Sequence, residues 1–318
     1  MGQIDPEAAA WLAAMAETGV TLDQLPVADA RAAFAGVIAQ CGGEPEPVAT
    51  VSTGKVPGPD GEIPVRIYTP QGSGLFPVLV YFHGGGWVIG SPETYDNVCT
   101  RLANRSHSVV VSVDYRMAPE HPFPAAIDDA VAAVRWVADH AGELNADVER
   151  IAVGGDSAGG NIAAVVALHS REHGPQLSYQ LLIYPATDFT RETESFESNG
   201  EGYFLTRELI DWFGNHYAAD PTDWRASPLR ASSLANLPPA YVVTAQFDPL
   251  RDEGEQYAAA LQAAGTEVTV NRVAGQPHGF ISMLGAISAG SAVLDDAGLA
   301  LRAAARQGWR PQLWLQEA

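Results

Sequence analysis

Short apolar segments and helical patterns alternate along most of this 318-residue chain, which limits the folds it can adopt. The strand-like segments after Pro70 are Pro77–Phe82, Val109–Val113, Arg150–Val153, Leu177–Tyr184, Ala240–Thr244 and Val268–Val273. Most of them are separated by helical patterns, such as Ala125–His140, Ala158–His169 and Glu253–Ala264. Strands that alternate with helices usually form a largely parallel sheet with helices on both faces. We therefore predict an α/β fold.

Two regions of the sequence fall outside this alternation. Residues 1–45 contain two short amphipathic patterns, about Pro6–Glu17 and Val27–Gln40, and residues 188–237 contain no strand-like run. We expect both regions to form a helical cap over the carboxyl edge of the sheet, where open sheets bind ligands. The core would then consist of residues 46–187 and 238–318 within one domain. For residues 188–237, an ordinary helical excursion is the alternative.

The charge balance excludes several classes of function. The chain has 18 basic and 38 acidic residues and a formal net charge of −20. Such a surface should repel nucleic acids and anionic membranes. The single lysine, Lys55, lies in a stretch rich in glycine and proline, which argues against Schiff-base and Ser–Lys mechanisms.

Membrane and secretion signals are also missing from the sequence. No apolar run approaches the roughly 20 residues that span a bilayer. The segment Ala8–Ala16 is short and flanked by acidic residues, unlike a secretory signal. Two cysteines, Cys41 and Cys99, are too few for a disulfide framework and fit a reducing compartment. We expect a cytoplasmic protein without a membrane span.

A candidate nucleophile lies between an apolar strand and an alanine-rich helix. The segment Gly155-Asp-Ser-Ala-Gly159 has the form G-x-S-x-G, in which a sharp turn lifts the serine hydroxyl above the sheet. Ser157 would then lie at a helix N-terminus, which favours developing negative charge. A phosphate-binding turn is the alternative, but neither G-x-G-x-x-G nor G-x-x-x-x-G-K-[ST] occurs here.

A serine nucleophile needs a base, and the base needs an acid that fixes its tautomer. His278 directly follows the last strand, whereas His169 and His173 are carried roughly 18 Å or more along the helix after Ser157. Asp248 ends the preceding strand and is the favoured acid. Asp188, one strand nearer the nucleophile, is the alternative. In this order the chain supplies Ser157, Asp248 and His278 as a triad.

A run of three glycines, Gly84–Gly86, follows another apolar strand. Such a run is costly in chain entropy, so we expect its backbone N–H groups to join that of Ala158 in binding an oxyanion. A flexible turn is the alternative. His83 should brace this loop rather than act as the base. Bulky side chains expected to border the substrate pocket are Trp87, Phe204, Leu205, Trp212 and Phe213.

Taken in order, these motifs resemble the hormone-sensitive-lipase-like family of microbial carboxylesterases, the GDSAG subgroup of bacterial family IV in the α/β-hydrolase superfamily. The matching segments are His83–Gly86, Asp114–Ala125, Gly154–Gly160, Asp248–Gly254 and His278–Phe280. The resemblance implies an eight-stranded, mostly parallel sheet with a helical cap. It also implies Ser157, Asp248 and His278 as triad, the N–H groups of Gly85, Gly86 and Ala158 as oxyanion donors, and neither a metal nor an organic cofactor.

The segment Asp114–Ala125 matches a structural signature of that family rather than a catalytic one. Arg116 and Glu120 could pair within it. Cis peptide bonds before Pro119 and Pro124 are expected, although only about 5–6% of X–Pro bonds are cis in folded proteins.

These observations favour a serine carboxylesterase that acts on short- to medium-chain acyl esters, with water and a small ester as its partners. A possible homodimer is also expected. An amidase, formamidase or deacetylase could use the same triad, because fold alone does not decide the substrate. A non-catalytic receptor is the remote alternative. The plant gibberellin receptor resembles this family but lacks the catalytic histidine, whereas His278 is present here.

Overall fold

The computed structural model describes residues 2–17 and 19–307. One 8-stranded sheet runs through the molecule in the order β1-β2-β4-β3-β5-β6-β7-β8. The strands are β1 (Thr50–Gly58), β2 (Gly61–Thr69), β3 (Phe76–Phe82), β4 (Val109–Val113), β5 (Ala146–Asp156), β6 (Tyr179–Ile183), β7 (Ala240–Phe247) and β8 (Val268–Pro277). Strand β2 pairs antiparallel with β1 and β4, and all other pairs are parallel. The predicted α/β architecture is confirmed.

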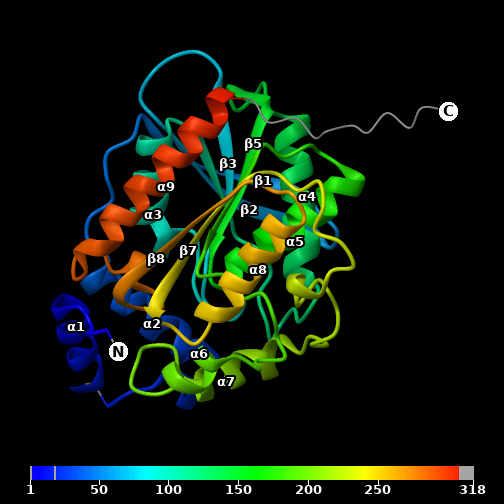
Figure 1. Cartoon of the computed structure of the whole chain (residues 1–318). Coiled ribbons are helices and arrows are strands. Elements are labelled where there is room, and N and C mark those ends of the chain that lie inside the picture. Colours follow the sequence, from blue (N-terminus) through cyan, green and yellow to red (C-terminus); the bar gives the residue numbers. More distant parts are fainter. Residues whose placement is uncertain (1, 18, 308–318) are drawn as a thin grey trace.

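Helices cover both faces of the sheet and gather at one end of it (Figure 1). They are α1 (Pro6–Glu17), α2 (Val27–Cys41), α3 (Asp96–Ser106), α4 (Ala125–Asp139), α5 (Ala158–His173), α6 (Glu194–Asn199), α7 (Arg207–Tyr217), α8 (Arg251–Ala263) and α9 (Ser288–Gln307). Helices α3 and α9 lie on one face, and α4, α5 and α8 lie on the other. Helices α2, α6 and α7 lie near the carboxyl ends of β7 and β8 (Figure 1).

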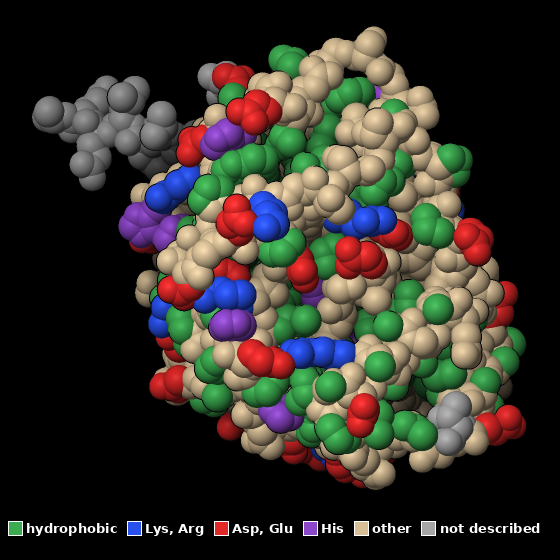
Figure 2. All heavy atoms as spheres, turned by 180° about the vertical axis from the view of Figure 1, so that it is seen from behind, with side chains coloured by type: hydrophobic (Ala, Val, Ile, Leu, Met, Phe, Trp, Pro, Cys, Tyr) green, Lys and Arg blue, Asp and Glu red, His purple; other side chains and the backbone are tan. Residues whose placement is uncertain are grey.

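The core is built from the central strands. Every residue of β4 is buried, as is every residue of β3 except Pro77. Apart from Ser112 in β4, both strands are apolar, which is typical of a sheet covered on both faces. Acidic and basic side chains are interspersed over the face seen in Figure 2 rather than gathered by sign. Within the described residues, every helix is too short or too polar to span a bilayer.

The segment between β4 and α4 has the two expected cis bonds, before Pro119 and Pro124. The expected pair between Arg116 and Glu120 is wrong. Arg116 instead contacts Asp129 on α4, with Nη2 2.8 Å from Oδ1 and its backbone N–H 2.9 Å from Oδ2. The reason is burial: the Asp129 side chain is fully buried and needs a cation, whereas Glu120 is exposed.

Glu120 pairs with Arg31 of α2, at 2.7 Å between Nη2 and Oε2. Arg31 also donates to two backbone carbonyls, with Nε 2.8 Å from Val88 O and Nη2 3.0 Å from Ala118 O. One side chain of the N-terminal region thus bonds both to the loop after β3 and to the loop after β4.

We predict that Asp129→Ala lowers the free energy of unfolding by about 3–5 kcal/mol, because it leaves the Arg116 guanidinium and N–H without their buried partner. Asp60→Ala is the matched control: Asp60 also pairs with Arg116 but is 73% exposed. It should cost less than about 1 kcal/mol. Urea titrations of both variants measure the difference, and equal losses would contradict the importance of the buried pair.

Candidate active site

Ser157 occupies a strained turn between β5, which ends at Asp156, and α5, which begins at Ala158. Its backbone has φ 55° and ψ −118°, which non-glycine residues rarely adopt. A side chain at Gly155 or Gly159 would collide with the carbonyl oxygen of Phe82 at the end of β3. The glycines therefore allow α5 to approach the sheet closely enough to form this turn.

His278 and Asp248 complete a hydrogen-bonded series with this serine. Nε2 of His278 lies 2.8 Å from Oγ of Ser157, and Nδ1 lies 2.7 Å from Oδ2 of Asp248. Asp248 is fully buried, and its other oxygen accepts the N–H of Leu250 at 2.8 Å. With the proton on Nδ1 donated to the carboxylate, Nε2 is free to accept the serine proton.

The other acids and histidines after Ser157 that could have served have different partners. Asp188 pairs with Arg230, at 2.9 Å between Oδ1 and Nε. The His169 and His173 rings contact each other on α5, and His216 packs against Trp212. Of the described histidines that follow Ser157, His278 alone is within hydrogen-bond distance of the serine.

The glycine loop after β3 is held by its surroundings. Gly85 and Gly86 have positive φ values of 118° and 59°. A side chain at Gly85 would collide with the carbonyl of Ile89, and one at Gly86 with the Phe213 ring. The N–H groups of Gly85, Gly86 and Ala158 make no hydrogen bond to another described residue. Free donors beside a serine are what binding of an oxyanion requires.

His83 braces this loop in its neutral form. Its Nδ1 lies 2.8 Å from the carbonyl oxygen of Gly84, and its ring stacks on Tyr115 at 4.5 Å between centroids. Tyr115 in turn donates to the His83 carbonyl at 2.7 Å. Complete burial lowers the pKa of His83 to about 4, so the side chain is uncharged near neutral pH.

Sequence reasoning missed the importance of Asp156. Its Oδ1 accepts the Gly84 N–H at 2.9 Å and the Tyr81 hydroxyl at 2.8 Å, while Oδ2 accepts the Tyr95 hydroxyl at 3.0 Å. This carboxyl therefore connects the turn at Ser157 directly to the glycine loop. Burial raises the pKa of Asp156 to about 6, despite these donors. Its position next to the serine was the one available signal.

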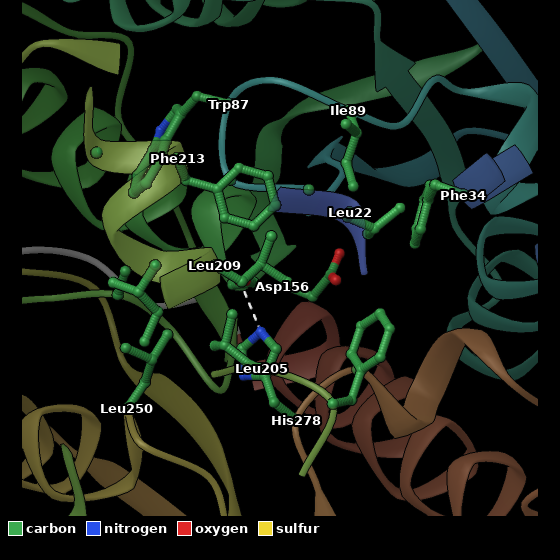
Figure 3. A pocket seen from close by; sticks show the side chains of 18 of the residues that line it. Leu22, Phe34, Trp87, Ile89, Asp156, Leu205, Leu209, Phe213, Leu250 and His278 are labelled. Atoms are coloured by element: carbon green, nitrogen blue, oxygen red, sulfur yellow. Dashed lines mark hydrogen bonds between the residues drawn. The ribbon is translucent and has the colours of Figure 1, made fainter. Parts of the chain in front are cut away.

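A largely apolar cavity opens onto Ser157 and His278. Figure 3 shows His278 at its wall. Four of the five bulky side chains expected from the sequence line it: Trp87, Phe204, Leu205 and Phe213. Trp212 is not among the lining residues. Its ring packs edge-on against that of Phe213, 5.3 Å between centroids. The lining residues that sequence reasoning missed include Leu22, Phe34, Ile89, Leu209, Leu250 and Met283.

Leu22 and Phe34 belong to the N-terminal region, yet they face the same cavity as Leu209 and Phe213 of α7 (Figure 3). No local pattern identifies such residues, because their role depends on how the N-terminal helices dock. Within residues 2–17 and 19–307, no group of three or more His, Cys, Asp or Glu side chains is placed to hold a metal ion.

Comparisons with known proteins agree on one family. A family model described as the alpha/beta hydrolase fold matches residues 79–282. The carboxylic ester hydrolase LipN of Mycobacterium tuberculosis is 50% identical over 238 residues, which cover 72% of this chain and 63% of that relative. Esterase LipI of the same organism is 44% identical over 257 residues, which cover 78% of this chain and 80% of that protein.

Solved structures give the same result over nearly the whole chain. An ester hydrolase from the metagenome of Lake Arreo is 46% identical with a TM-score of 0.92, covering 95% of this chain and 99% of its own. An esterase of Pyrobaculum calidifontis is 40% identical with a TM-score of 0.90, covering 95% and 98%. The chain therefore belongs to the α/β-hydrolase family, in its hormone-sensitive-lipase-like branch of carboxylic ester hydrolases.

Proposed function

We propose that this protein is a serine carboxylesterase that hydrolyses short- to medium-chain acyl esters through an acyl-enzyme on Ser157. The observation that carries the proposal is the series Ser157–His278–Asp248, with 2.8 Å and 2.7 Å between the bonded atoms, at the wall of an apolar cavity. The names of the relatives, carboxylic ester hydrolase and esterase, support the reaction class.

The reaction follows from the roles that these atoms can take. Oγ of Ser157 attacks the ester carbonyl while Nε2 of His278 accepts the serine proton, and Asp248 stabilises the imidazolium. The N–H groups of Gly85, Gly86 and Ala158 then hydrogen-bond the negative oxygen of the tetrahedral intermediate. His278 passes the proton to the leaving alcohol, and water hydrolyses the acyl-enzyme by the same steps in reverse order.

The cap limits the size of the acyl group in this proposal. Residues 2–17, 19–45 and 188–237 form the cap, and residues 46–187 and 238–307 form the catalytic core. The rest of the expected division, residues 1, 18 and 308–318, lies outside the described residues. Support comes from the cavity lining, where Leu22 and Phe34 meet Phe204 and Phe213 beside the triad. A walled apolar pocket binds each added CH₂ more tightly until the chain reaches the wall.

A cytoplasmic location is also part of the proposal. Cys41 and Cys99 are both free thiols, which is consistent with a reducing compartment. The possible homodimer stays a prediction of the sequence.

Turnover of p-nitrophenyl acetate tests the assigned residues. We expect Ser157→Ala and His278→Ala each to lower kcat by at least ~10⁴-fold, and the double variant to be no worse than either, because nucleophile and base act as a unit. His169→Ala is the control, since this histidine lies on α5 away from the serine. A wild-type protein no faster than Ser157→Ala would exclude the esterase function. If the losses in kcat of the two single variants add in the double variant, Ser157 and His278 do not act in the same step.

The acyl-length profile from C2 to C16 tests the cap. Activity should rise to about C4–C8, gaining about 0.8 kcal/mol for each buried CH₂, and then fall. Phe213→Ala removes a wall residue and should move the optimum to longer chains while turnover continues. Trp212→Ala is the matched control, because this neighbour does not line the cavity. If neither Phe213→Ala nor Phe204→Ala changes the profile, the cap does not set the acyl length.

A further inference from the structure

Glu253 is a buried acid in the wall of the active-site cavity that the proposed reaction does not use. It lies in the first turn of α8, is 1% exposed, and lines the same cavity as Ser157 and Leu250. Its Oε1 accepts the backbone N–H of Thr187 at 2.6 Å and that of Asp188 at 3.2 Å. These two bonds hold the carboxyl group in one orientation.

The second oxygen of this carboxyl group lacks a hydrogen-bond partner in the described part of the chain. This atom, Oε2, is buried. A buried polar atom without a partner costs about 1–3 kcal/mol, so native structures usually satisfy such atoms. An unfilled hydrogen bond in the wall of a largely apolar pocket is typical of a site that recognises a polar group on its ligand.

Burial, and to a smaller extent the neighbouring acids, favour the protonated form of this carboxyl group. Burial, together with the charges of Asp188 and Asp248, raises the pKa of Glu253 to about 8. Asp188 already pairs with Arg230, and Asp248 with His278, so neither is free to bond Oε2. Near neutral pH the group therefore presents mainly an O–H donor, and at higher pH a carboxylate acceptor.

We propose that Glu253 is a specificity-determining residue, whose Oε2 hydrogen-bonds a hydroxyl group on the acyl or alcohol part of the substrate. A hydroxyl suits this position because it can accept a hydrogen bond from the neutral acid and donate one to the carboxylate. The preferred substrates are then hydroxy-substituted esters rather than purely alkyl esters of the same size. This inference rests on the proposed esterase function and adds the substrate class.

Two matched pairs of esters test the inference, each replacing a hydroxyl by a methyl group. Ethyl 3-hydroxybutyrate is compared with ethyl 3-methylbutyrate, and 2-hydroxyethyl butyrate with propyl butyrate. The readout is the ratio of kcat/KM for the two members of a pair, from which any general loss of active enzyme cancels. For the wild type we expect a ratio of about tenfold in favour of the hydroxy ester in one pair.

Variants at Glu253 then identify the group responsible. Glu253→Met should lower the ratio in that pair by about tenfold and leave the other pair unchanged. Glu253→Gln keeps an acceptor for the Thr187 N–H and a donor in place of Oε2, so it should retain the ratio. Glu255→Met is the matched control on the same helix, since Glu255 pairs with Arg272 and does not line the cavity.

The outcomes separate this inference from the proposed function. Hydrolysis of all four esters with no hydroxy preference in either pair would overturn the inference and leave the esterase intact. A preference that Glu253→Met retains would assign Glu253 to supporting the Thr187–Asp188 backbone only. If Glu253→Met yields no folded protein, a hydroxy preference of the wild type that Glu253→Gln retains supports the inference. A wild type without that preference overturns it. Hydrolysis of none of the esters would overturn the esterase itself.

Discussion

The close approach of helix α5 to the carboxyl end of β3 is the constraint on which the active site depends. Gly155 and Gly159 both face the carbonyl oxygen of Phe82 at a distance that no Cβ atom could occupy. Ser157 stands at the start of α5, and the glycine loop leaves from the end of β3. One backbone contact thus sets the separation between the nucleophile and its candidate oxyanion donors, and Asp156 reinforces it through the Gly84 N–H.

Buried acids around this contact have different electrostatic roles. Asp248 pairs with His278, and the charge of this carboxylate stabilises the imidazolium that forms during the reaction. Asp156 is surrounded by hydroxyl and N–H donors, which offset part of the cost of its burial. Glu253 has fewer donors and the higher pKa of the two, about 8, so it adds little negative charge near neutral pH. Limiting fixed negative charge matters where a reaction creates an oxyanion.

The features that could be predicted from the sequence are those that depend on short sequence segments at the ends of strands. Ser157, His278 and the glycine loop each follow an apolar strand, and parallel strands bring their carboxyl ends to one edge. The pocket wall could only partly be predicted, because it depends on docking between distant regions. Phe213 and Trp212 are adjacent in sequence and equally bulky, yet the phase of α7 directs only Phe213 into the cavity.

Charge pairing was harder to predict for the same reason. Arg116 pairs with Asp129 on α4 and not with the nearby Glu120. The reason is that a buried carboxylate needs a cation more than an exposed one does. Asp156 and Glu253 are ordinary acids in the sequence. Their burial, and the donors that meet them, arise from segments up to 75 positions away, as for Tyr81 and Asp156.

The three acceptors of Arg31 have a consequence for engineering by recombination. Through this side chain, α2 is bonded to the carbonyls of Val88 and Ala118 and to the carboxylate of Glu120. The N-terminal helices are therefore not a separable module that rests on the core. A chimaera that exchanges residues 1–45 with those of a relative must transfer the matching loops around Val88 and Ala118 as well. Otherwise the transplanted segment loses its hydrogen bond to the carbonyl of Val88, which is only two residues from the glycine loop.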